Sequence, residues 1–303
     1  MAPLGVLLAL VALVSVSEPA FLTSGSLTSL AVDAGPVLLL VFGSTLVILL
    51  GGIDLSVGAL ASLSSVLLAL WLPGLGSWAV PAVIVVAAVL GAAQGFIQAA
   101  TQIPSFVVTL GGLGIFSGLA LRLSDASAQP LLESYALVDF AGADTLGVPN
   151  TLLVVAVVVA LLAAVMRFLP IGRRIYAVGA GERAALLSGV GTVRVRVFAF
   201  ATSGACAALA ALLLVAQTQF AGPDIADNLL LPAIAAVVVG GTAISGGVGG
   251  LGAALIGGLI VTVVRVGTVI VGLDPAVQNI VFGIGVIVAV ALTTDRAKIG
   301  IIK

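Results

Sequence analysis

The chain has 303 residues, of which 61% are hydrophobic and 8% are charged, and its formal net charge is −1. A soluble domain of this length needs far more polar residues to cover its surface, so the composition predicts a polytopic protein embedded in membrane lipid. The near-neutral charge gives no indication of a nucleic-acid partner. Because the chain has no histidine and one cysteine, Cys206 in an apolar run, we expect no metal site and no cofactor.

Ten apolar segments follow one another along the chain, each near or somewhat below the roughly 20 residues that a helix needs to cross a bilayer. They occupy residues 3–16, 37–50, 57–72, 79–100, 105–121, 152–168, 197–217, 230–244, 251–271 and 277–292. We therefore predict an all-α fold, with about ten transmembrane helices, some of them broken or re-entrant, in a single transmembrane domain over residues 1–303. Residues 21–33, rich in Ser and Thr, are predicted to lie at the membrane interface.

Two glycine-rich breaks interrupt the apolar segments, at residues 51–58 (GGIDLSVG) and 240–247 (GGTAISGG). The first carries Asp54, which lies either at the cytoplasmic interface or within the membrane on a broken helix. A carboxylate at membrane depth is tolerated where it caps a helix or lines a cavity, and both roles remain open for Asp54. Paired breaks in the two halves of a transporter point to a substrate site at the interface of a repeat, but the segments here do not form a clean five-plus-five repeat.

Several neutral polar residues lie inside or beside the apolar segments. Hydrogen bonding between helices is one interpretation, and a pathway for a neutral polar solute is the other. An ion pathway would show more buried charge. The candidate pathway residues are Asp54, Ser56, Gln94, Gln98, Thr109, Gln278 and Asn279.

Two polar loops carry opposite charge. Residues 122–150 are acidic, whereas residues 167–196 hold six of the eleven basic residues of the chain. Short basic loops stay in the cytoplasm, so the basic loop, about 169–196, predicts cytoplasmic termini and an outer position for the acidic loop. Within the basic loop, residues 182–188 (ERAALLS) predict a short helix between glycine-rich turns. Such a helix could be a docking element for a soluble partner. The alternative interpretation is an ordinary basic loop that only determines the membrane topology.

Five blocks, in order, resemble the permease subunits of ATP-binding-cassette importers for monosaccharides, the ribose-type group. They are GGIDLSVG at 51–58, GAAQG at 91–95, IPSFVVTLGGLGIFSGLAL at 103–121, GRRIYAVGAGERAALLSGV at 172–190 and IAAVVVGGTAISGGVGGLGAALIGG at 234–258. The family more often has Asn at Gln94, Pro at Ser105 and Asn at Gly181, and these departures bear on the identity of the solute.

The resemblance implies a pore of two permeases, as a homodimer or with a sister permease, in the inner (plasma) membrane. It also implies separate ATPase subunits in the cytoplasm and an extracytoplasmic binding protein that delivers a sugar similar to ribose, xylose or galactose. The family's coupling element, Glu-x-Ala-Ala followed by Gly, matches this sequence, and nearby charges would set its register on the ATPase. The residues expected to couple to the ATPase are Arg173, Arg174, Glu182, Arg183, Ala184, Ala185 and Gly189.

Other functions remain open at this point. A self-sufficient secondary transporter or channel for a small neutral solute would rely on intramembrane carboxylates such as Asp54 and Asp33 for ion coupling. Within the importer interpretation, the cargo could instead be a nucleoside, a furanose-like signal molecule or a branched-chain amino acid. An enzyme is not expected, because the sequence offers no clustered catalytic groups.

Overall fold

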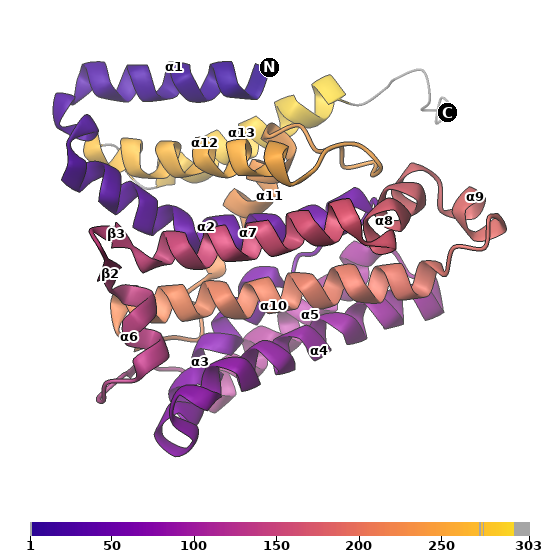
Figure 1. Cartoon of the computed structure of the whole chain (residues 1–303), viewed down its shortest axis with the longest axis horizontal. Coiled ribbons are helices and arrows are strands. Elements are labelled where there is room, and N and C mark those ends of the chain that lie inside the picture. Colours follow the sequence, from indigo (N-terminus) through magenta and orange to yellow (C-terminus); the bar gives the residue numbers. More distant parts are fainter. Residues whose placement is uncertain (1, 273, 275, 294–303) are drawn as a thin grey trace.

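The computed structural model describes residues 2–272, 274 and 276–293, and most of them are helical (Figure 1). The helices are α1 (Ala2–Ser17), α2 (Ser24–Leu49), α3 (Val57–Leu75), α4 (Ala79–Thr101), α5 (Ser105–Leu123), α6 (Ala136–Gly142), α7 (Asn150–Phe168), α8 (Pro170–Ala180), α9 (Glu182–Leu187), α10 (Thr192–Thr218), α11 (Leu230–Val239), α12 (Leu251–Ile270) and α13 (Ala276–Thr293). Three short 3₁₀ turns are η1 (Pro19–Leu22), η2 (Gly76–Trp78) and η3 (Asp227–Leu229).

The strands are short and peripheral. Strand β1 (Gln129–Pro130) pairs antiparallel with β4 (Phe220–Ala221), and β2 (Asp144–Thr145) pairs antiparallel with β3 (Val148–Pro149). Each of the ten predicted apolar segments coincides with a helix. Within the described residues, six helical segments are long and apolar enough to cross a membrane, counting the run Val57–Thr101 as one, and shorter apolar helices lie at Pro3–Ser17 and Asp227–Val239. The prediction of an all-α polytopic membrane protein is confirmed.

Helix α2 begins earlier than hydropathy indicates. Most of segment 21–33, predicted to be interfacial, belongs to this helix. Thr23 is its N-cap, and the Thr23 side chain accepts a hydrogen bond from the Ser26 amide at 3.4 Å. Capping chemistry therefore determines where the helix begins, even though the strongly apolar part starts more than two turns later.

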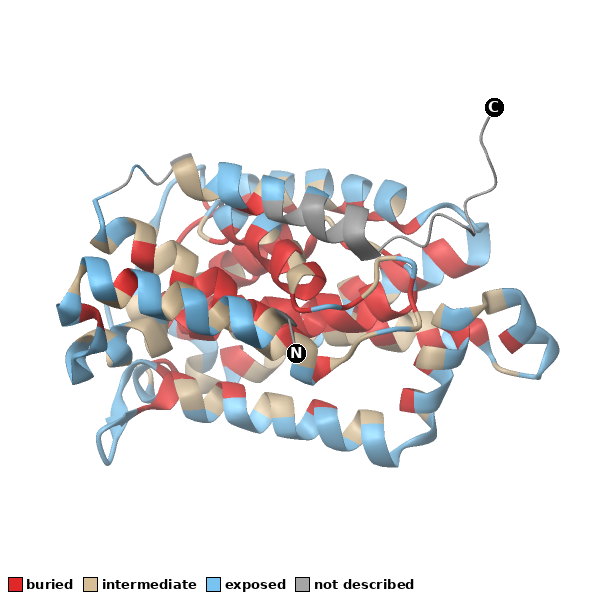
Figure 2. Ribbon diagram, turned by 90° about the horizontal axis from the view of Figure 1, so that it is seen from above, coloured by how far each residue is buried: buried red, intermediate tan, exposed pale blue. Residues whose placement is uncertain are grey.

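The centre of the bundle is formed by α2 and α10. All residues of α2 from Ala34 to Leu49 are buried, and α10 packs on α2, α3 and α4. Glycines bring α4 and α10 together, since a side chain at Gly91 would overlap the Phe200 carbonyl and one at Gly204 would overlap the Ala87 carbonyl. Buried residues fill the middle of the molecule and exposed ones lie on the outer faces of the surrounding helices (Figure 2). Close backbone approach of this kind is how apolar helices associate in a membrane.

The two polar loops lie at opposite ends of the bundle. Helix α6 and the strands β2 and β3, all from the acidic loop, lie at one end, while α8 and α9, from the basic loop, project at the other (Figure 1). This arrangement agrees with the expectation that the membrane separates the two loops. It also gives α9 an accessible position beyond the spanning helices.

Candidate functional site

Asp54 lies in the non-helical segment between α2 and α3, and it is only 4% exposed. Its Oδ1 accepts hydrogen bonds from the Ser56 amide at 2.9 Å and from Ser56 Oγ at 2.7 Å. Its Oδ2 accepts a hydrogen bond from Ser203 Oγ, on α10, at 2.9 Å. Three donors thus satisfy a carboxylate that apolar helices enclose, as a buried charge requires. The network ties the first break to α10.

The predicted capping role of Asp54 takes a modified form. The N-cap position of α3 is occupied by Ser56, whose side chain makes no capping bond. Asp54 instead accepts the amide of the residue two positions on, the pattern of an Asx turn. Its second oxygen reaches a different helix, so the side chain both shapes the turn and joins two elements.

The side chains of α4 and α5 complete this network. Gln94 Nε2, on α4, donates to Ser56 Oγ at 3.0 Å. Thr109, on α5, accepts from the Leu55 amide at 3.1 Å and lies 3.1 Å from the Ile53 carbonyl oxygen, to which it can donate. Ser105 Oγ accepts from the Ile53 amide at 2.9 Å. Irregular backbone at membrane depth needs such partners, because lipid supplies none.

The structure therefore gathers four of the predicted pathway residues, Asp54, Ser56, Gln94 and Thr109, around one break. It adds Ser105 and Ser203, which the sequence analysis did not select. Single serines in apolar helices give little signal of their own, although Ser105 stands where the resembling family more often has Pro. Contact with Asp54 becomes visible only in the fold.

The other three pathway candidates lie apart from these contacts. Gln98 is buried on α4, and its Oε1 has no hydrogen-bond partner within the described part of the chain. Gln278, on α13, donates to the Arg265 carbonyl at 3.1 Å and lines a cavity of about 200 Å³ together with Asp33 and Arg265. Asn279 is exposed. The pathway residues predicted together thus occupy at least two distinct places.

The second break meets the first at the end of α8. Four glycines make this contact, which we call the glycine junction: Gly51, Gly179, Gly246 and Gly247. The Gly247 amide donates to the Leu49 carbonyl at 2.9 Å. A side chain on Gly179 would overlap that carbonyl, and one on Gly246 would overlap the Gly51 amide. Gly246 and Gly247 also have φ of +85° and +75°, which favour glycine.

Tyr176 adds a side-chain bond beside the glycine junction. Its hydroxyl, on α8, donates to the Gly249 carbonyl at 3.0 Å. Partial burial raises the pKa of Tyr176, so the phenol stays protonated and keeps this donor at neutral pH. The loop that carries α9 is therefore in direct contact with both breaks.

The residues expected to couple to the ATPase divide into two groups. The exposed residues are Arg173, Arg174, Arg183, Ala184 and Gly189. Ala185 is 5% exposed and packs inward. Glu182 is bound within the chain, because its carboxylate pairs with Arg196 of α10. Two residues that the sequence analysis did not select, Leu186 and Leu187, are 58% and 85% exposed. Adjacent residues of a helix point in directions about 100° apart, and a helix of six residues in a polar loop has little apolar surface against which to bury both leucines, which was the signal available in the sequence.

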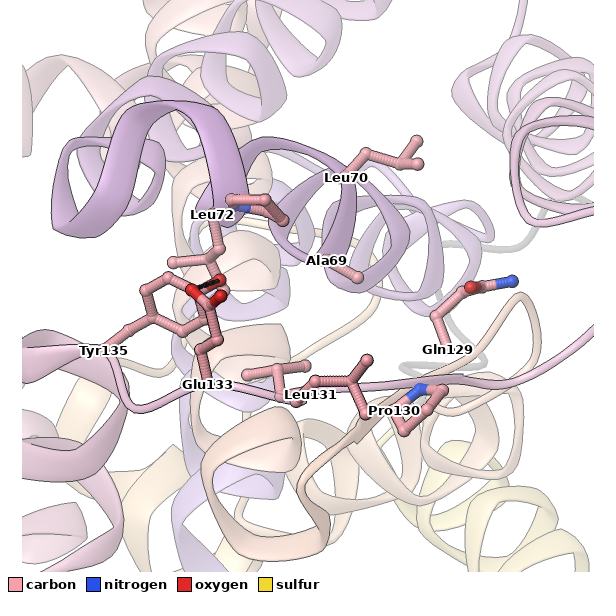
Figure 3. Close-up of a pocket in the computed structure, with 10 residues that line it drawn as sticks. Ala69, Leu70, Leu72, Gln129, Pro130, Leu131, Glu133 and Tyr135 are labelled. Carbon is pink, nitrogen blue, oxygen red and sulfur yellow. Dashed lines mark hydrogen bonds between the residues drawn. The ribbon is translucent and has the colours of Figure 1, made fainter.

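A separate cavity of about 370 Å³ lies between the end of α3 and residues 129–135. Figure 3 shows the Tyr135 ring beside Leu72, and the Tyr135 hydroxyl donates to Glu133 at 3.3 Å. Ala69, which lines this cavity, is about 18 Å along the axis of α3 from the start of that helix. The cavity is therefore distant from Asp54, at the end of the bundle opposite α9.

Comparison with known proteins identifies the family. A family model described as "Branched-chain amino acid transport system / permease component" matches residues 26–290. The chain belongs to this family. The permease is a multi-pass membrane protein and a transport component rather than an enzyme.

Curated relatives align with the permease over most of its length. The ribose import permease protein of Bacillus subtilis (strain 168) is 36% identical over 299 residues, which cover 95% of the permease and 90% of the relative. The D-allose transport system permease protein of Escherichia coli (strain K12) is 34% identical, covering 92% and 86% respectively. The ribose import permease protein of the same strain is 32% identical, covering 96% and 92%. No solved structure matches the permease.

Proposed function

We propose that the permease forms the translocation pathway of an ATP-binding-cassette importer for a monosaccharide similar to ribose, xylose or galactose. The observation that carries this proposal is the near full-length similarity to the ribose import permease of Bacillus subtilis, at 36% identity over 95% of the chain. The similarity to the D-allose transport system permease supports a sugar cargo as well. The protein resides in the inner (plasma) membrane with both termini in the cytoplasm.

The partners follow from the two ends of the bundle. A separate ATPase subunit docks on α8 and α9, where Leu186 and Leu187 are available to enter an apolar groove and Arg183 to meet acidic groups beside it. Arg173 and Arg174 extend the same basic surface along α8. An extracytoplasmic sugar-binding protein contacts the opposite end, and a second permease completes the pore.

The solute pathway passes the Asp54 network. In this conformation, hydroxyl, amide and backbone groups around Asp54 form hydrogen bonds with one another. When the two permeases rearrange on ATP binding, these neutral donors and acceptors exchange their partners for sugar hydroxyls, and Gln98, with its unpartnered buried oxygen, is placed to do the same. Gln278 and Asn279 belong to a separate part of the pathway, on α13. Alternating access of this kind requires two arrangements of the same packed helices.

Copurification followed by reconstitution tests the function. Tagged permease is isolated from its host in detergent, the accompanying proteins are identified by mass spectrometry, and the complex is placed in liposomes with the copurified binding protein. We expect a P-loop ATPase to accompany the permease, and uptake of labelled ribose, xylose, galactose or allose to require ATP. Sugar uptake by the permease alone, without nucleotide, would instead establish the secondary-transporter function. ATP-driven uptake of a nucleoside or a branched-chain amino acid, with no sugar uptake, would overturn the cargo.

A further inference from the structure

The coupling segment is joined to α10 by a bidentate ion pair. Arg196 Nε donates to Glu182 Oε1 at 3.0 Å, and Arg196 Nη2 lies 2.5 Å from Glu182 Oε2. Two parallel bonds between a guanidinium and a carboxylate fix orientation as well as distance. Glu182 is the first residue of α9 and Arg196 lies in the first turns of α10, so the pair connects two helices that a short loop separates.

Burial and helix position make this pair more than a surface contact. The Arg196 side chain is 11% exposed and that of Glu182 is 35% exposed. Removal of either partner leaves the other charge partly desolvated without compensation. In addition, the amino-terminal end of a helix disfavours cations and favours anions. Glu182, in the first turn of α9, therefore lies at a favourable helix end, and it also neutralises Arg196 in the second turn of α10.

Helix α10 makes a second side-chain contact, which we also call an anchor, further along its length. Ser203, the α10 partner of Asp54, lies seven residues after Arg196, so the two side chains project from one face of α10, about 10 Å apart along its axis. One anchor holds the coupling helix and the other holds the first break. A rigid helix that is fastened at both points moves them together.

Close packing against α4 supports α10 between these two contacts. A side chain on Gly95 of α4 would meet the Arg196 carbonyl, and one on Gly91 would meet the Phe200 carbonyl. Gly204 makes the reciprocal approach to the backbone of α4. The stretch of α10 from Arg196 to Gly204 is therefore seated against a second helix along its whole length, and a displacement at one end reaches the other.

We propose that the Glu182–Arg196 pair is an internal strut that fastens α9 to α10, so that movement of α9 is passed along α10 to Asp54. Glu182 and Arg196 are positioning residues, and the exposed side chains of α9 make the contact with the partner. The transmission role rests on the proposed function of α9 as the ATPase docking element. The strut itself is a property of the isolated permease and is tested separately.

The first experiment measures hydrogen exchange of residues 182–190 in the full permease, reconstituted alone in lipid nanodiscs. Glu182→Gln and Arg196→Gln should each increase the exchange rate there by about tenfold. The charge-reversed pair Glu182→Arg with Arg196→Glu should restore most of the protection. Arg194→Gln is the matched control, because it removes an exposed arginine from the same turn of α10. Unchanged exchange in the single variants, or no restoration in the reversed pair, would overturn the strut.

The second experiment measures transport in the complete complex with its ATPase and binding protein. Each single variant should retain the ATPase on purification but lose roughly tenfold in sugar transported per ATP hydrolysed, and the reversed pair should recover it. If Glu182→Gln releases the ATPase while Arg196→Gln does not, Glu182 contacts the partner and the transmission role is wrong. If wild-type permease binds no ATPase at all, the proposed function fails, yet the nanodisc result still decides the strut.

Discussion

At the scale of single residues, the polar groups around the first break are buried together with hydrogen-bond partners from other elements. Asp54 has three donors, from two elements that are far apart in sequence. Thr109 and Ser105 satisfy the backbone of the same break from a third element. Such a network holds an irregular segment in one arrangement while leaving groups that can exchange partners with a polar solute.

The first prediction concerns the donors around Asp54. Asp54→Ala leaves the Ser56 amide and the Ser203 hydroxyl without their acceptor in a buried place, which costs about 1–3 kcal/mol for each unpaired group. Asp54→Asn keeps an acceptor oxygen, and the Ser203 hydroxyl can turn to accept from the new amide. We expect the alanine variant to unfold roughly 5 °C below the asparagine variant in a detergent thermal assay.

The control for this comparison is Asp144→Ala, which removes an exposed carboxylate on β2 at the end of the bundle opposite α9. Its unfolding temperature should stay at the wild-type value. Equal stability of the alanine and asparagine variants at Asp54 would show that the surrounding donors do not depend on an acceptor at this position.

At the scale of elements, the glycine junction sets how closely three segments approach. The end of α8, the end of α2 and the loop before α12 meet with their backbones in contact. The sequence indicated two glycine-rich breaks, and the structure explains the glycines: side chains there would separate the breaks from each other and from α8. The end of α8, which leads into α9, is thereby in direct contact with the first break, in addition to the link through α10.

The second prediction tests the glycine junction with two alanine substitutions. Gly179→Ala places a methyl group against the Leu49 carbonyl and the Gly247 amide, in a helix where the backbone itself accepts alanine. We expect a loss of about 1–3 kcal/mol in stability from this overpacking. Gly252→Ala, in α12, meets open space and should be neutral or stabilising. A stability for Gly179→Ala equal to that of Gly252→Ala would contradict the close approach.

The third prediction concerns the exposed face of α9. Leu186→Ser with Leu187→Ser removes two exposed leucines, each worth about 1.5–3 kcal/mol if a partner buries it. Copurification of the ATPase should therefore fall by more than tenfold while the unfolding temperature of the permease stays unchanged. Leu146→Ser, a fully exposed leucine at the other end of the molecule, is the matched control and should leave ATPase binding intact. Retention of the ATPase by the double variant would place the docking surface elsewhere.

At the scale of the whole molecule, hydropathy predicts where the helices lie, whereas the contacts between them become visible only in the structure. Each of the ten apolar segments is a helix, because length and apolar composition are local properties. The start of α2 was missed because capping determines it. The Ser203–Asp54 and Glu182–Arg196 contacts were also missed, since pairs separated by 149 and 14 residues leave no periodic signal. For the same reason, Gln278 was predicted to share a pathway with Asp54, although in the structure it lies on α13 beside Asp33 and Arg265.

The fourth prediction tests which side of the membrane each polar loop occupies. The native Cys206 is 2% exposed and lies inside the bundle, so an impermeant maleimide should not label the wild-type permease. Ala128→Cys and Ser188→Cys then place one accessible thiol in the acidic loop and one just after α9. We expect labelling of Ala128→Cys in intact cells and of Ser188→Cys only after the membrane is opened.

This orientation follows from the distribution of arginine, because six of the eleven basic residues lie at positions 167–196 and basic loops are retained in the cytoplasm. It also determines whether α9 can meet an ATPase at all, since that subunit resides where ATP is. The reverse labelling pattern would place α9 outside and remove the physical basis for docking there. Labelling of both sites in intact cells would mean that the basic and acidic loops share one side, which is incompatible with their positions at opposite ends of the helix bundle.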